Sequence, residues 1–182
     1  YICHQMPNSP TCRAIYYSDT ATALVLYDAE VEYLYGGDMH REKVENLLKR
    51  HIEVNGRSCH EHLQVAITAF YIPVPDMGEH SGFHKYAMRT SIDFPLINFA
   101  LRCGGVRPPK VVVGAVAPEP VILDKTAALL CGNASDDEVT SACEVELCEL
   151  ARPIREACIP PARKKDLYKQ IDGLLFLRRC ME

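Results

Sequence analysis

The spacing of apolar residues in the first half of the chain predicts two helices and two strands. Residues 20–26 form an apolar segment directly after Ser18-Asp19, whose side-chain oxygens can cap the free amides of a helix. Apolar and polar residues alternate over 30–35 and again over 63–72, which is the pattern of a half-buried strand. Between these strands, residues 41–51 carry apolar positions at helical spacing. We therefore expect an antiparallel sheet with helices in this half.

The second half of the chain predicts strands followed by three helices. The segment 83–103 has the composition of one or two strands, interrupted at Phe94-Pro95, and a Gly104-Gly105 turn leads from it into the apolar run 111–113. Strands connected in this way form a β-hairpin. The expected helices are residues 125–130, with Asp124 as N-cap and Gly132 as the stop, a helix behind the capping box at 135–138, and a last helix that buries Leu167, Ile171, Leu174 and Leu175.

Composition and charge exclude two classes of function. The chain has 182 residues with a net charge of −4 and a pI near 6.0, and its basic residues are scattered among acidic ones, so we set nucleic-acid binding aside. No apolar run approaches the roughly 20 residues that span a bilayer, and no charged-then-apolar leader opens the chain. We expect a soluble, cytoplasmic protein. Because the chain begins at Tyr1 without a methionine, we also expect residues upstream.

Cysteine and histidine are the residues that suggest metal chemistry. The chain has nine cysteines, an odd number, and reduced thiols are the better default without a secretory signal. Cys3 and Cys12 differ from the rest because they bracket a loop with two prolines, and such a loop can turn both sulfurs inward onto a metal or cluster. His60 and His62 would share one face of a strand, but no third zinc ligand is evident, and surface histidines are the alternative.

Residues 83–95, 113–121 and 17–31 together resemble segments of one known family, the FAD-binding medium subunits of the molybdenum hydroxylases such as xanthine dehydrogenase and carbon monoxide dehydrogenase. Residues 83–95 resemble the Lys, Arg and Asp-Phe-Pro signature that closes the flavin domain of these subunits. Residues 113–121 resemble the hairpin exit that opens their C-terminal domain, and residues 17–31 resemble the Ser-Asp segment, helix and strand of the second flavin subdomain. The resemblance covers nearly the whole chain.

The resemblance implies an α+β fold in two domains. Residues 1–90 would form the antiparallel-sheet second subdomain of the FAD-binding domain, with the remnant of an iron-sulfur loop at 1–13. Residues 91–182 would form a domain like the C-terminal domain of the carbon monoxide dehydrogenase flavoprotein, in which helices cover a β-hairpin or sheet.

The resemblance assigns flavin contacts to Ser18, Asp19, Ile67, Thr68 and Lys85. Asp19 can accept hydrogen bonds from ribityl hydroxyls, and its alternative role is that of a helix cap. Lys85 can place a cation near the electron-rich end of a reduced isoalloxazine and so tune its potential, and its alternative role is that of a solvated strand lysine. Arg89 and Asp93 are expected to pair with each other as structural residues.

One segment resembles a single branch of this family. Residues 2–4 and 12–14, just ahead of Ser18, resemble the end of the loop that carries a 4Fe-4S cluster on four cysteines in 4-hydroxybenzoyl-CoA reductase-type subunits. Cys3 and Cys12 would be the last two ligands, and the others would lie upstream of Tyr1. The Gly-rich segment that holds the FAD pyrophosphate has no counterpart here either. We therefore expect the chain by itself to bind FAD weakly or not at all, and two cysteines cannot hold the cluster alone.

The resemblance implies an electron-transfer subunit without substrate chemistry of its own, so the isolated chain should be inactive. The intact assembly would combine this subunit with a molybdopterin-binding large subunit and a small subunit carrying 2Fe-2S clusters, as a dimer of heterotrimers, without nucleic acid or membrane. Two alternatives remain open: a xanthine or carbon monoxide dehydrogenase-type medium subunit in which the cysteine pair is incidental, or a cofactor-free fragment that binds a partner.

Overall fold

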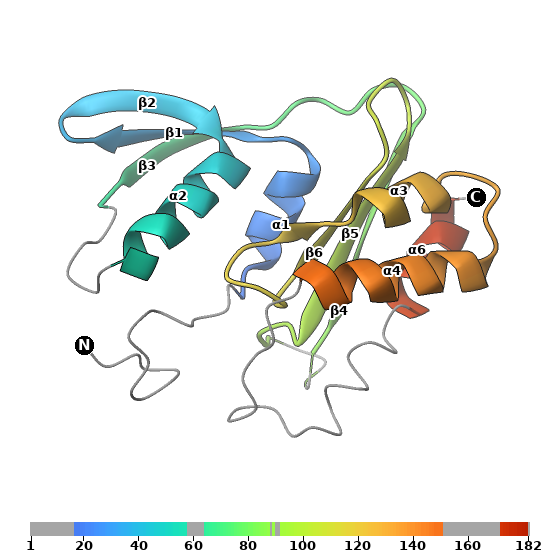
Figure 1. The fold of residues 1–182 in the computed structure, drawn as a ribbon. Coiled ribbons are helices and arrows are strands. Elements are labelled where there is room, and N and C mark those ends of the chain that lie inside the picture. The colour runs from blue at the N-terminus through green and yellow to red at the C-terminus, as the bar shows by residue number, and fades with distance from the viewer. Residues whose placement is uncertain (1–16, 58–63, 88, 90–91, 151–171, 182) are drawn as a thin grey trace, which may run out of the picture.

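The structure is a computed structural model that describes residues 17–57, 64–87, 89, 92–150 and 172–181. It contains two antiparallel sheets with helices packed between and against them (Figure 1), so the predicted α+β class is confirmed. In chain order the elements are α1 (Asp19–Leu26), β1 (Glu30–Tyr35), β2 (Asp38–Lys43), α2 (Val44–Arg57), β3 (Ala66–Tyr71), β4 (Glu79–Tyr86), β5 (Ile97–Gly104), β6 (Lys110–Gly114), β7 (Val121–Ile122), α3 (Asp124–Leu130), α4 (Asp136–Leu150) and α6 (Asp172–Met181).

The first sheet has the strand order β2-β1-β3. Gly36 and Gly37 have φ angles of +63° and +97°, a region that glycine adopts without strain, and they turn the chain directly from β1 into β2. The helix predicted from residue 41 therefore begins only at Val44, because residues 38–43 form a strand. β2 is polar and largely exposed, so the pattern of hydrophobic positions could not indicate it.

The second sheet has the strand order β4-β5-β6-β7. The predicted hairpin is confirmed as β5 and β6, and β4 pairs with the whole of β5 on its other side. β4 begins at Glu79, ahead of the predicted start at residue 83. The domain boundary predicted between residues 90 and 91 falls between β4 and β5 in the sequence, so residues from both predicted domains share this sheet. The division into domains 1–90 and 91–182 stays a prediction.

Both faces of the second sheet are covered, which explains why β5 and β6 are apolar runs without alternation. One face packs against α3, α4 and α6, and the other packs against α1 (Figure 1). The core on the α1 side contains Leu24 and Val25 of the helix together with Val31 of β1, Val44 of α2 and Val112 of β6. α1 is therefore fixed between the two sheets.

The helix caps agree with the sequence at two helices and differ at the third. Ser18 is the N-cap of α1, and its Oγ accepts from the amide of Ala21 at 3.0 Å. The capping box of α4 forms as predicted between Ser135 and Glu138. The predicted cap of α3 is wrong: the N-cap position is Leu123, without a side-chain hydrogen bond, and Asp124 is already helical.

A glutamate from another helix caps α3 instead. Glu146 of α4 is buried, and its carboxylate accepts from the amides of Lys125 and Thr126 at 3.0 and 2.8 Å and from the Thr126 hydroxyl at 2.7 Å. A carboxylate at a helix N-terminus pairs free amides and complements the helix dipole. The contact is a tertiary one, so no local pattern predicts it.

Replacing Glu146 with glutamine is expected to lower the free energy of unfolding by about 1 to 2 kcal/mol, because one acceptor oxygen becomes an amide that faces the donors at the start of α3. Urea unfolding followed by circular dichroism would measure the change. Glu144→Gln on the exposed side of α4 is the matched control and should change the free energy of unfolding little. Equal stability of the two variants would contradict the capping role.

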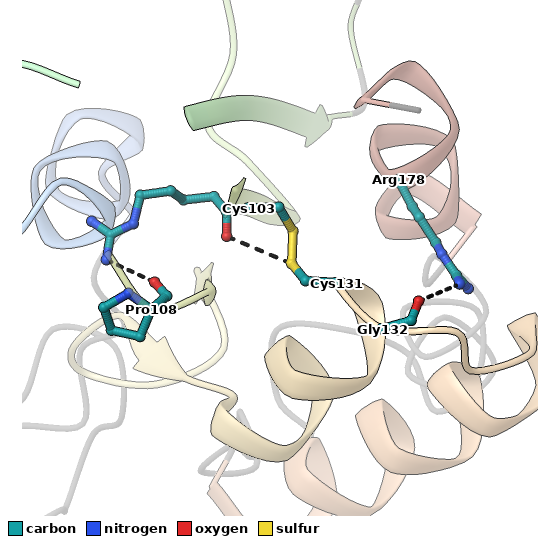
Figure 2. The surroundings of a disulfide bond; sticks show 6 residues. Cys103, Pro108, Cys131, Gly132 and Arg178 are labelled. Atoms are coloured by element: carbon teal, nitrogen blue, oxygen red, sulfur yellow. Dashed lines mark hydrogen bonds between the residues drawn. A yellow bond between two sulfur atoms is a disulfide. The ribbon is translucent and has the colours of Figure 1, made fainter. Parts of the chain in front are cut away.

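Two cysteines are joined in a disulfide. Cys103 at the end of β5 and Cys131 directly after α3 are bonded with their Cα atoms 5.8 Å apart, a usual separation. Figure 2 shows the bond tying the end of the strand to the end of the helix. The expectation of reduced thiols is therefore wrong for this pair. Cys143 and Cys148 are free, and burial raises the pKa of the Cys143 thiol to about 12, which makes it unreactive.

Candidate functional site

Asp19 and Lys85 form an ion pair at the junction of α1 and the second sheet. The Lys85 Nζ donates to Asp19 Oδ2 at 2.7 Å. Asp19 is the first residue of α1 and Lys85 is near the end of β4, so the packing of the helix on the sheet brings them together. Their side chains are 37% and 27% exposed, which leaves the pair accessible to a ligand. The structure thus joins two residues to which the sequence assigned separate contacts.

A backbone carbonyl supplies the second acceptor for Lys85. The ammonium also donates to the carbonyl oxygen of Asp93 at 2.5 Å. Arg89 holds Asp93 in place, since the backbone amide and the guanidinium of Arg89 donate to the Asp93 carboxylate at 3.0 and 3.2 Å. The hydrogen bond from Arg89 holds the pKa of Asp93 below its ordinary value. The predicted pairing of Arg89 with Asp93 is therefore confirmed, and it fixes an acceptor of Lys85.

Asn98 holds the Asp19 carboxylate from the interior. It is fully buried on β5, opposite Lys85 in the strand register, and its Nδ2 donates to Asp19 Oδ1 at 2.7 Å. Its Oδ1 accepts from the hydroxyl of Thr22 at 3.0 Å. Gly114 on β6 leaves room for this contact, because a Cβ there would collide with both Asn98 and Thr22. Sequence reasoning missed these residues, although an amide inside the apolar run of β5 was a usable signal.

The ion pair keeps hydrogen-bonding capacity for a ligand. An ammonium has three N–H donors, and Lys85 uses two of them on acceptors within the described residues. Each carboxylate oxygen of Asp19 has two lone pairs and accepts one hydrogen bond from the same part of the chain. Asp19 can therefore accept hydrogen bonds from ligand hydroxyls, and Lys85 can place a positive charge beside an electron-rich group of the ligand.

Exposed aromatic side chains accompany the ion pair. Phe83 lies two residues before Lys85 on the same face of β4 and is 41% exposed. Phe94, which follows the loop acceptor Asp93, is 72% exposed, and its ring centroid lies 6.1 Å from that of Tyr17. Aromatic rings next to a few convergent polar groups are typical of sites for planar organic ligands.

The other predicted contacts lie elsewhere or serve the fold. The Ser18 hydroxyl is occupied as the N-cap of α1. Ile67 and Thr68 lie on β3 of the first sheet, where Ile67 is half exposed and Thr68 donates to Glu32 at 2.8 Å. No hydrogen bond among the described residues joins them to Asp19 or Lys85. The proposed metal ligands Cys3 and Cys12 lie outside the described residues, and so do the histidines His60 and His62. Within those residues, no group of three or more potential metal ligands is found.

Three cations fix the C-terminal end of α1. Arg102, Arg107 and Lys110 donate to the carbonyls of residues 26, 27 and 25 at 2.7, 3.2 and 2.7 Å. Cations are favourable there because they pair the free carbonyls and complement the helix dipole. Asp28, with a φ of +56°, neutralises two of them through contacts of 2.9 and 2.8 Å with Arg102 and Lys110. With Asn98 bonded near its start, α1 is held to the second sheet at both ends.

Solved structures share this fold, although no protein-family model and no curated protein matches the sequence. Quinoline 2-oxidoreductase from Pseudomonas putida 86 superposes with a TM-score of 0.68 at 17% identity over 93% of this chain and 59% of that chain. The Cu,Mo-CO dehydrogenase gives 0.61 at 16% identity over 88% and 54%. Carbon monoxide dehydrogenase from Hydrogenophaga pseudoflava, in a form lacking the Mo-pyranopterin moiety of the molybdenum cofactor, gives 0.61 at 14% over 89% and 54%.

These likenesses define the fold. The chain shares its α+β architecture with these quinoline 2-oxidoreductase and carbon monoxide dehydrogenase chains, and it spans between 54% and 59% of their length. None of the helices that the structure describes is long and apolar enough to cross a membrane.

Proposed function

We propose that this chain is part of the FAD-binding, electron-transfer subunit of a molybdenum-containing oxidoreductase. The observation that carries the proposal is the Asp19–Lys85 ion pair, in which two of the five residues assigned to the flavin by the sequence resemblance meet at one accessible point. The fold it shares with quinoline 2-oxidoreductase and the CO dehydrogenases supports the same conclusion.

The residues of this site fit a flavin. The free lone pairs of Asp19 suit ribityl hydroxyls, and the third N–H of Lys85 suits an electron-rich edge of the ring system. Phe83 and Phe94 offer aromatic surface for a planar group. Ser18, Ile67 and Thr68 are proposed as further contacts, the last two from the first sheet. Bound FAD would supply the electron transfer, and the protein would supply its binding, orientation and electrostatic environment.

Within this class, we propose a 4-hydroxybenzoyl-CoA reductase-like enzyme of the cytoplasm. Cys3 and Cys12 would then be two of the four ligands of a 4Fe-4S cluster. The partners would be a molybdopterin-binding large subunit and a small subunit with 2Fe-2S clusters, assembled as a dimer of heterotrimers. The subunit would relay electrons between FAD, the clusters and the molybdenum centre.

Metal and flavin analysis of the natural subunit that contains this chain would test the assignment. Flavin together with about four irons per subunit supports the reductase-like proposal. Flavin without iron instead supports a medium subunit of the xanthine or carbon monoxide dehydrogenase type. Neither flavin nor iron would overturn the proposal and favour a cofactor-free module that binds a partner.

Variants of the ion pair test the site itself. In the natural subunit, Asp19→Ala is expected to weaken FAD binding about tenfold or more, the size expected for hydrogen bonds to a charged acceptor. Lys85→Met is expected to lower the flavin midpoint potential, by about 30 mV for each 1.4 kcal/mol of two-electron stabilisation that is lost. Arg41→Met is the control, because it breaks an exposed ion pair with Glu30 in the first sheet. An unchanged affinity in Asp19→Ala would place the flavin elsewhere.

A further inference from the structure

We infer that the buried Asn98 and its partner Thr22 are positioning residues, which orient the Asp19 carboxylate and through it the Lys85 ammonium toward the ligand. The inference rests on the proposed flavin site and adds two residues to it. Neither Asn98 nor Thr22 reaches the exposed surface of the site, since both are fully buried. Their effect on a ligand must therefore pass through Asp19.

The chemistry of the four groups fixes the direction of the hydrogen bonds. An ionised carboxylate only accepts hydrogen bonds, so the side of Asn98 that faces Asp19 must be its NH₂ group. The amide oxygen then faces Thr22, whose hydroxyl lies 3.0 Å from it and 3.1 Å from the carbonyl of Ser18. Flipping the Asn98 amide would set two oxygens against each other. The network therefore holds Asp19 in one orientation, with Oδ1 toward Asn98 and Oδ2 toward Lys85.

The place of Asn98 in the fold shows that its polarity is not needed for packing. It lies in β5 between Ile97 and Phe99, and asparagine is disfavoured in strands. A buried amide costs free energy unless its polar atoms have hydrogen-bond partners, and here the nitrogen and the oxygen each have one. An apolar residue of similar volume would suit a strand that is otherwise buried and apolar. The pairing with Asp19 is what distinguishes Asn98 from such a residue.

The first test needs no flavin. In the 182-residue chain, acetylation of Lys85 by acetic anhydride would be measured by mass spectrometry relative to Lys49, an exposed lysine paired with Glu45. In Asn98→Leu the carboxylate loses its buried anchor, so we expect the relative acetylation rate of Lys85 to rise about fivefold, the factor that corresponds to one lost hydrogen bond. An unchanged relative rate in a folded variant would overturn the inference.

The second test uses variants at Thr22 and covers the case in which Asn98→Leu fails to fold. Thr22→Val keeps the shape and removes the hydroxyl, whereas Thr22→Ser keeps the hydroxyl. In the natural subunit we expect Thr22→Val to bind FAD about threefold to tenfold more weakly and Thr22→Ser to restore the affinity. Thr20→Val, at an exposed position of α1, is the control.

The two tests separate failure of this inference from failure of the proposed function. If both Thr22 variants bind FAD with the same affinity, the hydroxyl has no positioning role and the inference is overturned. A different outcome is that Lys85 acetylation rises in Asn98→Leu while neither the parent subunit nor any variant binds FAD. That result would support the orienting network and refute the flavin assignment.

Discussion

Replacing Arg102 with alanine is expected to lower the free energy of unfolding by about 3 to 5 kcal/mol, the combined cost of a buried cavity and of acceptors that lose their hydrogen bonds. Arg102 is 1% exposed. Its guanidinium donates to the carbonyls of residues 26 and 108 at 2.7 and 3.2 Å and to the Asp28 carboxylate at 2.9 Å. The alanine variant removes these three hydrogen bonds, leaves Asp28 paired with Lys110 alone, and opens a cavity beside α1.

Denaturant unfolding of matched variants would measure this effect. Arg41→Ala is the control, because its guanidinium is half exposed and its ion pair with Glu30 lies on the surface, where such pairs contribute less than about 1 kcal/mol. Arg102→Met keeps most of the aliphatic volume, so the difference between Arg102→Met and Arg102→Ala separates lost packing from lost charge. Equal losses in Arg102→Ala and Arg41→Ala would show that the Arg102 cluster contributes no more than a surface ion pair.

The pH dependence of stability offers an independent check on the same cluster. Burial by itself would raise the pKa of Asp28, but hydrogen bonds and charges from Lys110 and Arg102 outweigh it, so the pKa lies below its ordinary value. A carboxyl with a lowered folded-state pKa stabilises the fold above its unfolded pKa of about 4, and this stability is lost as the pH falls through the folded-state pKa. The decrease in the free energy of unfolding on acidification should be smaller in Arg102→Ala than in the parent chain.

The parts of the fold that follow from local signals were predictable from the sequence. Ser18 and the Ser135–Glu138 box are side-chain caps that act within one turn, and both form as expected. The β5–β6 hairpin was indicated by an apolar run on either side of two glycines. The contributions that sequence reasoning missed are tertiary. The strand β2 is a polar edge that exists because β1 pairs with it, and the cap of α3 comes from Glu146, twenty or more positions away.

The candidate site also contains residues that the sequence indicated and residues that only the tertiary packing reveals. The resemblance indicated Asp19 and Lys85, but only the packing of α1 on the second sheet shows that they bind each other. The buried Asn98 and Thr22 and the small Gly114 lie behind them and belong to no recognisable motif, since their roles depend on three elements meeting at one point. The Cys103–Cys131 bond was not predictable either. The number and spacing of cysteines in a sequence do not show which of their side chains lie together in the fold.

Gly114 is the residue at which stability and the candidate site are most directly coupled. Gly114→Val is expected to lower the free energy of unfolding by about 3 kcal/mol, the upper end of the usual cost of overpacking, because the added atoms would overlap Asn98 and Thr22. Gly132→Ala is the control, since a Cβ there meets only carbonyl oxygens at 3.3 Å or more. Thermal or urea unfolding would measure both variants.

The smaller change Gly114→Ala separates the effect on stability from the effect on the orientation of Asp19. The added methyl group would push α1 away from β6 at the point where Thr22 bonds to Asn98. The Asp19 carboxylate should then lose its fixed orientation while the chain is still folded. We expect acetylation of Lys85 to increase in Gly114→Ala at temperatures well below its unfolding transition, and to stay at the parent rate in Gly132→Ala. A destabilised Gly114→Ala chain with unchanged Lys85 reactivity would show that Asp19 keeps its orientation when the helix shifts, and the coupling between Gly114 and the site would then be absent.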